Sequence, residues 1–303
     1  MYRRVVTKEI EEIARVELNE TPQNRIETLA HIEEWIKKQP HINLRMGGFW
    51  LLNFIRGCKF STQKVKEKLE DYLKLKHTAP EVFSNRDPLL PPLQDMLKKG
   101  SITPFGTPDK ECVIVRWEGF DPNKVCFNDI LKLASMFLDA FMLESETCMA
   151  VGQYVIIDLK GFSYAFLPQI TPLTLKRIVY NMLITYPMRI KCIYFINCVS
   201  CVETLYNLTK SFLSTKIQNR ISFFGDDFNE IFKTIPKKYF PIEYGGCANS
   251  IDEIADLWKN EIESCRNWLL DDTNCCLNNV KKVSNGNGII NGTHGSFRKL
   301  EFD

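Results

Sequence analysis

The first 80 residues place apolar and polar side chains with the period of an α-helix. Apolar residues recur three or four positions apart in 7–20, 22–39 and 61–75, and the segment 49–55 is almost entirely apolar. Thr21-Pro22 is typical of a helix start, because threonine caps the first backbone amides and proline fits the first turn. We therefore predict a small helical unit, followed by a proline-rich connection between Pro80 and Pro108.

Beyond this connection, short β-branched runs alternate with helical stretches. The predicted strands are 112–117, 154–158, 192–197 and 221–224. A broad apolar helix face spans 127–146, and Trp258, Ile262 and Trp268 mark a last helix. Strands separated by helices predict an α/β fold with a mainly parallel sheet.

The change of pattern suggests three parts. We expect an N-terminal helical domain over 1–95, an α/β domain over 96–272 and a polar C-terminal tail over 273–303. The tail is rich in Asn, Gly and Ser, and Phe297, Leu300 and Phe302 are the residues with which it could dock onto the rest of the chain.

Composition and charge narrow the class of partner. The 303 residues carry 39 Lys+Arg against 37 Asp+Glu, a formal net charge of +2, which gives no global field for nucleic acid. Eleven cysteines, an odd number spread along the chain, are not a small disulfide framework. The N-terminus lacks the apolar core of a signal peptide, and no run approaches 18 apolar residues. We expect a cytoplasmic protein that does not bind nucleic acid.

The residues that catalysis most often needs are missing from the α/β region. The four histidines are His31, His41, His77 and His294, so none lies between 78 and 293. This excludes a Ser-His-Asp, a Cys-His and a His-based metal site there, and no glycine-rich phosphate loop follows a strand. We therefore expect that the protein is not an enzyme and that it binds neither a metal nor a cofactor. One redox alternative stays open, at Cys198 and Cys201.

Positive charge is concentrated in one stretch, 186–220. It holds five basic residues against the single acid Glu203, a local charge of +4. Arg189 and Lys191 share a strand face because side chains alternate, and Lys216 and Arg220 are four residues apart on the following helix. The cluster is either a solvated face or an anion site, most naturally for a phosphorylated headgroup.

An apolar stripe lies inside the same stretch. Its members at helical spacing include Val202, Leu205, Leu208 and Phe212. Such a stripe is ordinarily core. Between two groups of basic residues, it is also what a protein needs in order to touch a membrane interface. Both interpretations stay open on periodicity alone.

Several motifs together resemble one family. Val155-Ile-Ile-Asp-Leu-Lys-Gly161, Gln169-Ile-Thr-Pro172, Tyr186-Pro187, Ile196-Asn197, Lys210-Ser-Phe-Leu213 and Phe240-Pro-Ile-Glu-Tyr-Gly-Gly246 follow one another in the order of the CRAL-TRIO (Sec14-like) lipid-binding family. The resemblance covers about 21–270 and is strongest to the branch of the α-tocopherol transfer protein and cellular retinaldehyde-binding protein. Phe54-Ile-Arg56 with Phe60 resembles the segment that closes the family's helical domain, and 295–300 resembles the tails of insect members.

The resemblance implies a carrier without catalysis. A three-helix bundle would precede an α/β domain whose sheet floors an apolar cavity, closed by a lid helix over 199–213. The lid residues would be Val202, Leu205, Leu208 and Phe212. Residues matching the lipid-binding cavity wall are Leu131, Ala134, Leu138, Tyr154, Ile157, Tyr164, Ile170, Ile178, Met182, Tyr186, Ile190 and Ile193.

The same resemblance implies a phosphoinositide site at the basic cluster. Arg189, Lys191 and Lys216 match the family's headgroup residues, and we add Arg220 from its spacing. A fourth family position is occupied by Cys58 in place of a basic residue. The expected function is intracellular transfer of a tocopherol-, retinoid- or similar terpenoid-like lipid at phosphoinositide membranes.

Two polar residues bear on the kind of ligand that the cavity would accept. Gln153 and Asn181 replace apolar positions, so they either offer polar groups to a ligand or face solvent. The alternative function is a Sec14-like scaffold that engages a protein partner, with the cavity vestigial.

Overall fold

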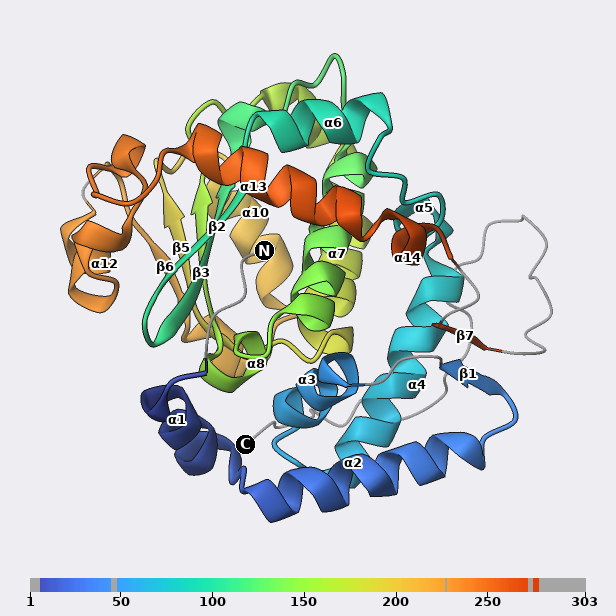
Figure 1. The fold of residues 1–303 in the computed structure, drawn as a ribbon. Coiled ribbons are helices and arrows are strands. Elements are labelled where there is room, and N and C mark those ends of the chain that lie inside the picture. Colours follow the sequence, from blue (N-terminus) through green and yellow to red (C-terminus); the bar gives the residue numbers. More distant parts are fainter. Residues whose placement is uncertain (1–5, 45–47, 227, 272–274, 278–303) are drawn as a thin grey trace.

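The computed structural model describes residues 6–44, 48–226, 228–271 and 275–277 (Figure 1). Its N-terminal part is helical, with α1 (Lys8–Leu18), α2 (Pro22–Lys37), α3 (Phe49–Gly57), α4 (Thr62–Thr78), α5 (Pro80–Phe83) and α6 (Pro91–Lys98). The hydroxyls of Thr7 and Thr21 accept hydrogen bonds from the first-turn amides of α1 and α2, as expected for helix caps.

Helices α2, α3 and α4 pack on one another as the predicted three-helix bundle. Helix α3 lies at its centre, and every residue from Trp50 to Arg56 is buried. This agrees with the nearly continuous apolar run, because a helix that is apolar all round has no face for solvent.

A five-stranded sheet forms the second part, with the order β2-β3-β4-β5-β6. Strand β2 (Ile102–Thr107) pairs antiparallel with β3 (Lys110–Arg116). Strands β4 (Gln153–Asp158), β5 (Ile190–Ile196) and β6 (Ile221–Phe223) continue the sheet in parallel. The four predicted strands and the mainly parallel sheet are therefore confirmed. Sequence reasoning missed β2, because Pro104 and Gly106 interrupt its pattern and proline is tolerated only at a sheet edge.

Among the described residues, the α/β part carries eight further α-helices: α7 (Phe127–Glu144), α8 (Cys148–Val151), α9 (Pro172–Ile178), α10 (Val202–Lys210), α11 (Thr215–Gln218), α12 (Asn229–Thr234), α13 (Ile251–Ser264) and α14 (Arg266–Leu270). A π-helical stretch, Val179–Thr185, continues α9. In Figure 1, α7 and α12 lie on opposite sides of the sheet, and α13 crosses the end of the molecule that holds α6.

Part of the predicted tail is a strand. Residues Cys275–Leu277 form β7, which pairs antiparallel with β1 (Ile42–Leu44) in a separate two-stranded sheet. Phe297, Leu300 and Phe302 lie outside the described residues.

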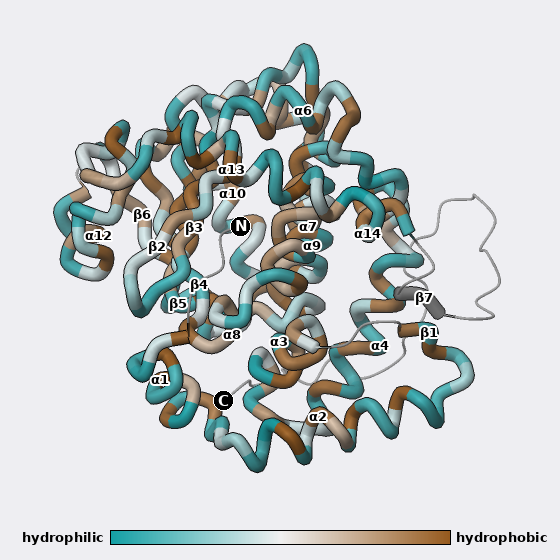
Figure 2. The backbone as a smooth tube through the Cα atoms, in the orientation of Figure 1, coloured by the Kyte–Doolittle hydropathy of each residue, from teal (hydrophilic) through white to brown (hydrophobic). Residues whose placement is uncertain are grey.

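The two faces of the large sheet differ in their packing. Ile114, Ile156 and Tyr194 are in register across three strands and belong to a buried cluster with Ile231 and Phe240. The alternate row, Val115, Ile157 and Phe195, faces α7 and packs only partly against the main core. Figure 2 shows apolar α7 and α3 at the centre and mixed hydropathy along the outer α1 and α2.

Helix α1 is not part of the bundle. Its buried side chains, Ile10, Ala14 and Leu18, form a small apolar cluster with Ala150 and Val151 at the end of α8. Figure 1 shows α1 below the lower end of the sheet, beside α8. The first predicted helix therefore packs on the α/β part rather than on its neighbours in sequence.

The backbone of the bundle lies very close to the segment that precedes β5. A Cβ built on Gly57 would lie 2.1 Å from the carbonyl oxygen of Pro187. We expect Gly57→Ala to destabilise the fold by about 1–3 kcal/mol, because the obstacle is backbone and cannot rotate away. Chemical denaturation measures this. Gly225→Ala is the control, since its Cβ would meet nothing within 4 Å and should change the free energy of unfolding far less.

Candidate functional site

Apolar side chains at the middle of the sheet are only half-buried. Val155 and Ile157 belong to β4, which is hydrogen-bonded to a strand on each side, so their exposure arises on the face of the sheet. Phe195, opposite Ile157, is also half-buried. Because interiors are normally close-packed, this face is an incompletely packed apolar layer.

The elements across this face contribute more half-buried apolar side chains. Ala134 and Leu138 come from α7, Ile178 from the end of α9, and Met182 from the π-helical stretch. We call these four residues, with Val155, Ile157 and Phe195, the apolar layer. They offer dispersion contacts and little else, so the layer suits an uncharged apolar ligand.

Helix α10 covers the layer without being buried in it. No residue of α10 is buried, and Val202 and Leu205 pack half-buried against the core. Leu208 is 43% exposed, and Phe212 is half-buried just beyond the helix. The stripe therefore packs against the core on one side only, and Leu213, just beyond the helix, is its one buried member. A helix with so few buried side chains is held weakly, as a movable cover requires.

Most predicted wall residues lie in or beside the apolar layer. Half-buried members are Ala134, Leu138, Ile157, Ile178 and Met182, and buried ones are Leu131, Ile170, Ile190 and Ile193. Their assignment to a ligand stays a prediction.

Three tyrosines depart from the predicted wall. Tyr154 is in register with Cys112 and Cys192 and packs on the opposite face of the sheet, because it is an odd number of positions from Ile157. Tyr186 is fully buried, and its hydroxyl donates to Asp139 at 3.0 Å. Both assignments are wrong. Tyr164 is 53% exposed, and its hydroxyl lies 3.3 Å from that of Ser200, just before α10.

The two polar replacements are both buried. The amide of Gln153 donates to the carbonyl of Cys148 and accepts from the backbone N–H of Arg189 at 2.9 Å. It ties β4 to the start of β5, so it faces neither ligand nor solvent. Asn181 is 3% exposed within the π-helical stretch and stays a candidate partner for a polar group of a ligand.

Arg189, just before β5, and Lys191, within it, converge on one acid from α1. Arg189 donates to a carboxylate oxygen of Glu17, and the Nζ of Lys191 lies 2.7 and 2.6 Å from the two oxygens. Arg189 also donates to the carbonyls of Met149, at 2.6 Å, and Ala150. Burial lowers the pKa of Arg189, and Glu17 opposes that shift.

Two further arginines, Arg220 and Arg56, lie near this pair. Arg220 donates to the carbonyl of Ile190 and lies just before β6, beyond the end of α11, while Lys216 is exposed on α11. The predicted placement of both on one helix is therefore wrong, because α11 ends at Gln218. Arg220 and Arg56 lie close enough to Arg189 for their charges to lower its pKa further.

Arg56 is the member of the cluster that sequence reasoning missed. It pairs with Glu20 at 2.7–2.8 Å and donates to the carbonyl of Glu146. Cys58, two residues later, is buried, and burial raises the pKa of its thiol to about 11. Cys58 therefore adds no charge, but Arg56 supplies a cation from the same helix. Its place in the Phe54-Ile-Arg56 motif was the available signal.

The redox alternative at Cys198 and Cys201 finds no support, and neither does a catalytic role for Asp158, the last residue of β4. Burial raises the pKa of Cys198, whereas a redox thiol needs a lowered one. Asp158 accepts from the backbone N–H of Lys160 and from the side chains of Asn197 and Tyr244, so it closes a turn. Among the described residues, no three His, Cys, Asp or Glu side chains gather as metal ligands.

A shallow groove lies elsewhere, between α1 and the β2–β3 turn. It has a volume of about 650 Å³ and is lined by residues including Lys8, Glu12 and Asp109. None of the predicted wall residues contributes to it, and its charged rim does not suit an apolar ligand.

Comparison with known families identifies the part of the chain in which the apolar layer lies. A model described as the CRAL/TRIO domain matches residues 96–246, which include every residue of the layer. The chain belongs to the CRAL-TRIO family. A second model, described as a Pinta-like UBA domain, matches residues 21–93. Helix α1 lies outside both matched segments.

Curated relatives agree with this CRAL-TRIO assignment. The chain is 27% identical over 251 residues to the α-tocopherol transfer protein-like proteins of Mus musculus and Homo sapiens, covering 82% of this chain and 72% of each relative. It is 26% identical to clavesin-1 of Rattus norvegicus, covering 80% of this chain and 69% of that one. A solved structure titled "Crystal structure of Sfh5" aligns with a TM-score of 0.47 at 13% identity, over 82% of this chain and 92% of that chain.

Proposed function

We propose that this CRAL-TRIO protein is a cytoplasmic carrier that binds a hydrophobic lipid and transfers it at phosphoinositide-containing membranes. The lipid would be tocopherol-, retinoid- or similar terpenoid-like. The observation that carries the proposal is the apolar layer, half-buried at the centre of the sheet and covered by a helix with no buried residue. The relatives named for tocopherol transfer support the same class of ligand.

The energetics suit a carrier. A long terpenoid presents on the order of 400 Å² of apolar surface, which gives about 10 kcal/mol of gross stabilisation at about 25 cal/mol per Å². Association and ordering oppose part of this. Because the remainder makes release into water slow, the carrier needs a trigger at the membrane. An anionic surface that binds the open-lid form better would supply it.

Exposed apolar side chains near the lid support docking at a membrane surface. Leu173 of α9, Tyr180 and Ile184 of the π-helical stretch and Leu208 of α10 are all substantially exposed, and α9 contacts α10. Among the described residues, no helix is long and apolar enough to span a bilayer. The proposed association is therefore peripheral, through this face and the basic cluster.

The experiment that tests the ligand class is native mass spectrometry of the purified full chain, with solvent extraction of what it holds. We expect one apolar lipid per chain, or uptake of a supplied tocopherol or retinoid. Protein that neither retains nor takes up such a lipid, while still folded, would contradict the proposal and favour a scaffold that engages a protein partner.

Two substitutions on one strand locate the ligand. We expect Ile157→Trp to reduce lipid uptake at least tenfold, because the indole ring is much larger than the isoleucine side chain and would fill the space at the apolar layer. Tyr154→Trp is the matched control, since this residue faces the opposite side of β4 and should leave uptake unchanged. Fluorescence titration with a tocopherol or retinoid measures both, and thermal unfolding checks that both fold. Equal loss in both variants would place the ligand elsewhere.

A further inference from the structure

Helix α1 brings an acid onto the proposed headgroup site. The helix docks through the small cluster of Ile10, Ala14 and Leu18, and its last turn places Glu17 against Arg189 and Lys191. The side chain of Arg189 is only 10% exposed in this arrangement. One carboxylate thus occupies the donors that an incoming phosphate would use.

The contact is electrostatic and strongly formed. Burial favours the neutral acid at Glu17, but the hydrogen bonds and charges of Lys191 and Arg189 outweigh it and hold the pKa of Glu17 below its ordinary value. Glu17 is therefore ionised at neutral pH. The following Glu20 in turn pairs with Arg56, so two acids from one short segment neutralise the surrounding cations.

The attachment of α1 is also one that can be released. Its apolar contact is small: three of its side chains are buried and Ile13 packs half-buried beside them, while Val16 is 66% exposed. Asn19, in a left-handed conformation, ends the helix before α2 begins at Pro22. A rotation at this junction would move α1 and release its contact with the half-buried Phe60, while α2, α3 and α4 keep their packing on one another, because hinges are a few residues at the ends of elements.

We propose that α1 is an autoinhibitory latch, in which Glu17 occupies the basic cluster until a headgroup bearing more than one phosphate displaces it. This rests on the proposed function and adds a selection step to it. A headgroup with a single negative charge gains nothing on exchange, because it merely replaces the Glu17 carboxylate by another single anion. A multiply phosphorylated inositol carries more charge and more acceptor oxygens than a carboxylate, so it gains on exchange. The latch therefore discriminates among anionic membranes.

The test compares binding of the full chain to vesicles of phosphatidylcholine that contain either phosphatidylserine or phosphatidylinositol bisphosphate. We expect Glu17→Gln to raise affinity for phosphatidylserine vesicles about fivefold or more, since one additional net positive charge acts at the surface. Affinity for bisphosphate vesicles should rise less, so the preference between the two lipids falls. An unchanged preference would overturn the proposal.

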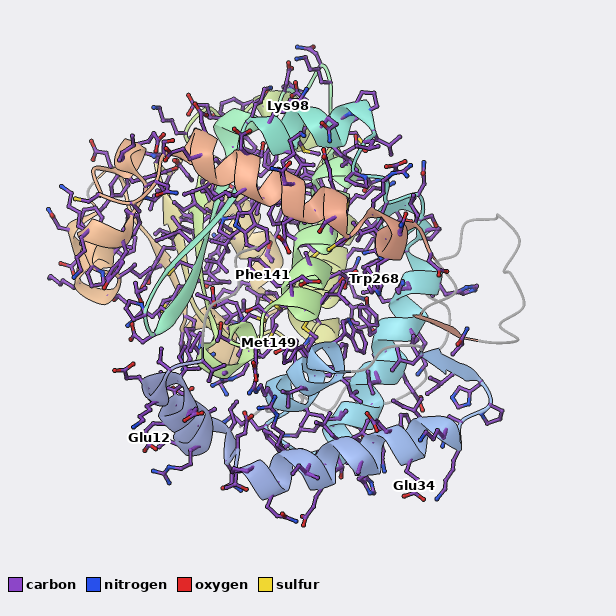
Figure 3. All side chains as sticks on the ribbon, viewed as in Figure 1. Glu12, Glu34, Lys98, Phe141, Met149 and Trp268 are labelled. Atoms are coloured by element: carbon purple, nitrogen blue, oxygen red, sulfur yellow. The ribbon has the colours of Figure 1, made fainter. Side chains whose placement is uncertain are left out.

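Glu12→Gln is the matched control. Glu12 lies on the same helix (Figure 3), where it is exposed at the rim of the shallow groove and pairs with Arg15 of α1 itself. It changes the net charge equally and should leave the lipid preference unchanged. If it acts as strongly as Glu17→Gln, total charge and not the latch explains the effect, and the proposal fails.

A second pair of variants removes docking without changing charge. We expect Leu18→Ala to raise phosphatidylserine binding in the same direction as Glu17→Gln, because it loosens α1 from α8. Val16→Ala, at an exposed position of the same turn, should have no effect. Circular dichroism confirms that each variant is folded, and no gain with Leu18→Ala would contradict a latch that works by undocking.

Soluble inositol trisphosphate separates the headgroup from the membrane. Tighter binding of it to Glu17→Gln than to the unsubstituted chain supports competition at the cations themselves. No difference, with vesicle binding also unchanged, overturns the latch. Loss of all phosphoinositide binding on neutralising Arg189 and Lys191 would still support the proposed function, so the two failures are distinguishable.

Discussion

Replacing both Arg189 and Lys191 by glutamine is expected to lower affinity for phosphoinositide vesicles about thirtyfold, at about 1 kcal/mol for each basic residue near the surface. The rate of lipid transfer to such vesicles should fall with it. Ligand affinity in solution should be retained, because neither side chain belongs to the apolar layer. Vesicle co-sedimentation and a fluorescence transfer assay measure the two effects.

The control for this pair removes the same charge elsewhere. Lys98→Gln with Lys238→Gln changes two exposed lysines, and Lys98 lies at the opposite end of the molecule from α1 (Figure 3). We expect at most a weak effect on vesicle binding. Equal losses in both double variants would mean that only net charge matters, and unchanged transfer after neutralising Arg189 and Lys191 would contradict headgroup-triggered release.

Replacing Asp139 by asparagine is expected to destabilise the protein by about 3–5 kcal/mol, because it leaves Arg86 charged, buried and unpaired. The side chains of Asp139 and Arg86 are 0% and 1% exposed, and they form an ion pair. The same carboxylate accepts from the hydroxyls of Tyr72, at 2.9 Å, and Tyr186. The network joins α4, α7 and the approach to β5. Chemical denaturation measures the loss.

Two control variants test whether the unpaired charge of Arg86 causes the expected loss of stability. Asp256→Asn, at an exposed position of α13, should change the free energy of unfolding by less than about 0.5 kcal/mol. Replacing both partners, with Arg86→Met and Asp139→Asn, should cost less than Asp139→Asn alone, since no charge stays buried and the amide oxygen can still accept from the two tyrosine hydroxyls. A double variant as unstable as the sum of its parts would show that the pair itself is not the cause.

The sequence predicted the elements whose signal is local. The helical period of apolar residues predicted the N-terminal helical unit and α7, the β-branched runs predicted four strands, and the ordered motifs predicted the family together with its three-helix bundle. Strand β2 was missed because its Pro104 and Gly106 resemble a loop until a sheet edge accommodates them. Strands β1 and β7 lie more than 200 residues apart, and nothing local shows that they pair.

The sequence by itself determined which side chains exist for each role: a broad apolar helix over 127–146, an apolar stripe over 202–213 and an excess of basic residues over 186–220. Only the tertiary structure decided which of them meet. Tyr154 and Ile157 lie an odd number of positions apart on β4, so their side chains point to opposite faces of the sheet. The pairing of β4 with its neighbouring strands shows which face each side chain occupies. Glu17 meets Arg189 and Lys191 across more than 170 residues, because the apolar face of α1 finds its partner on α8. Periodicity records the face that an element presents, and long-range packing alone decides what that face covers.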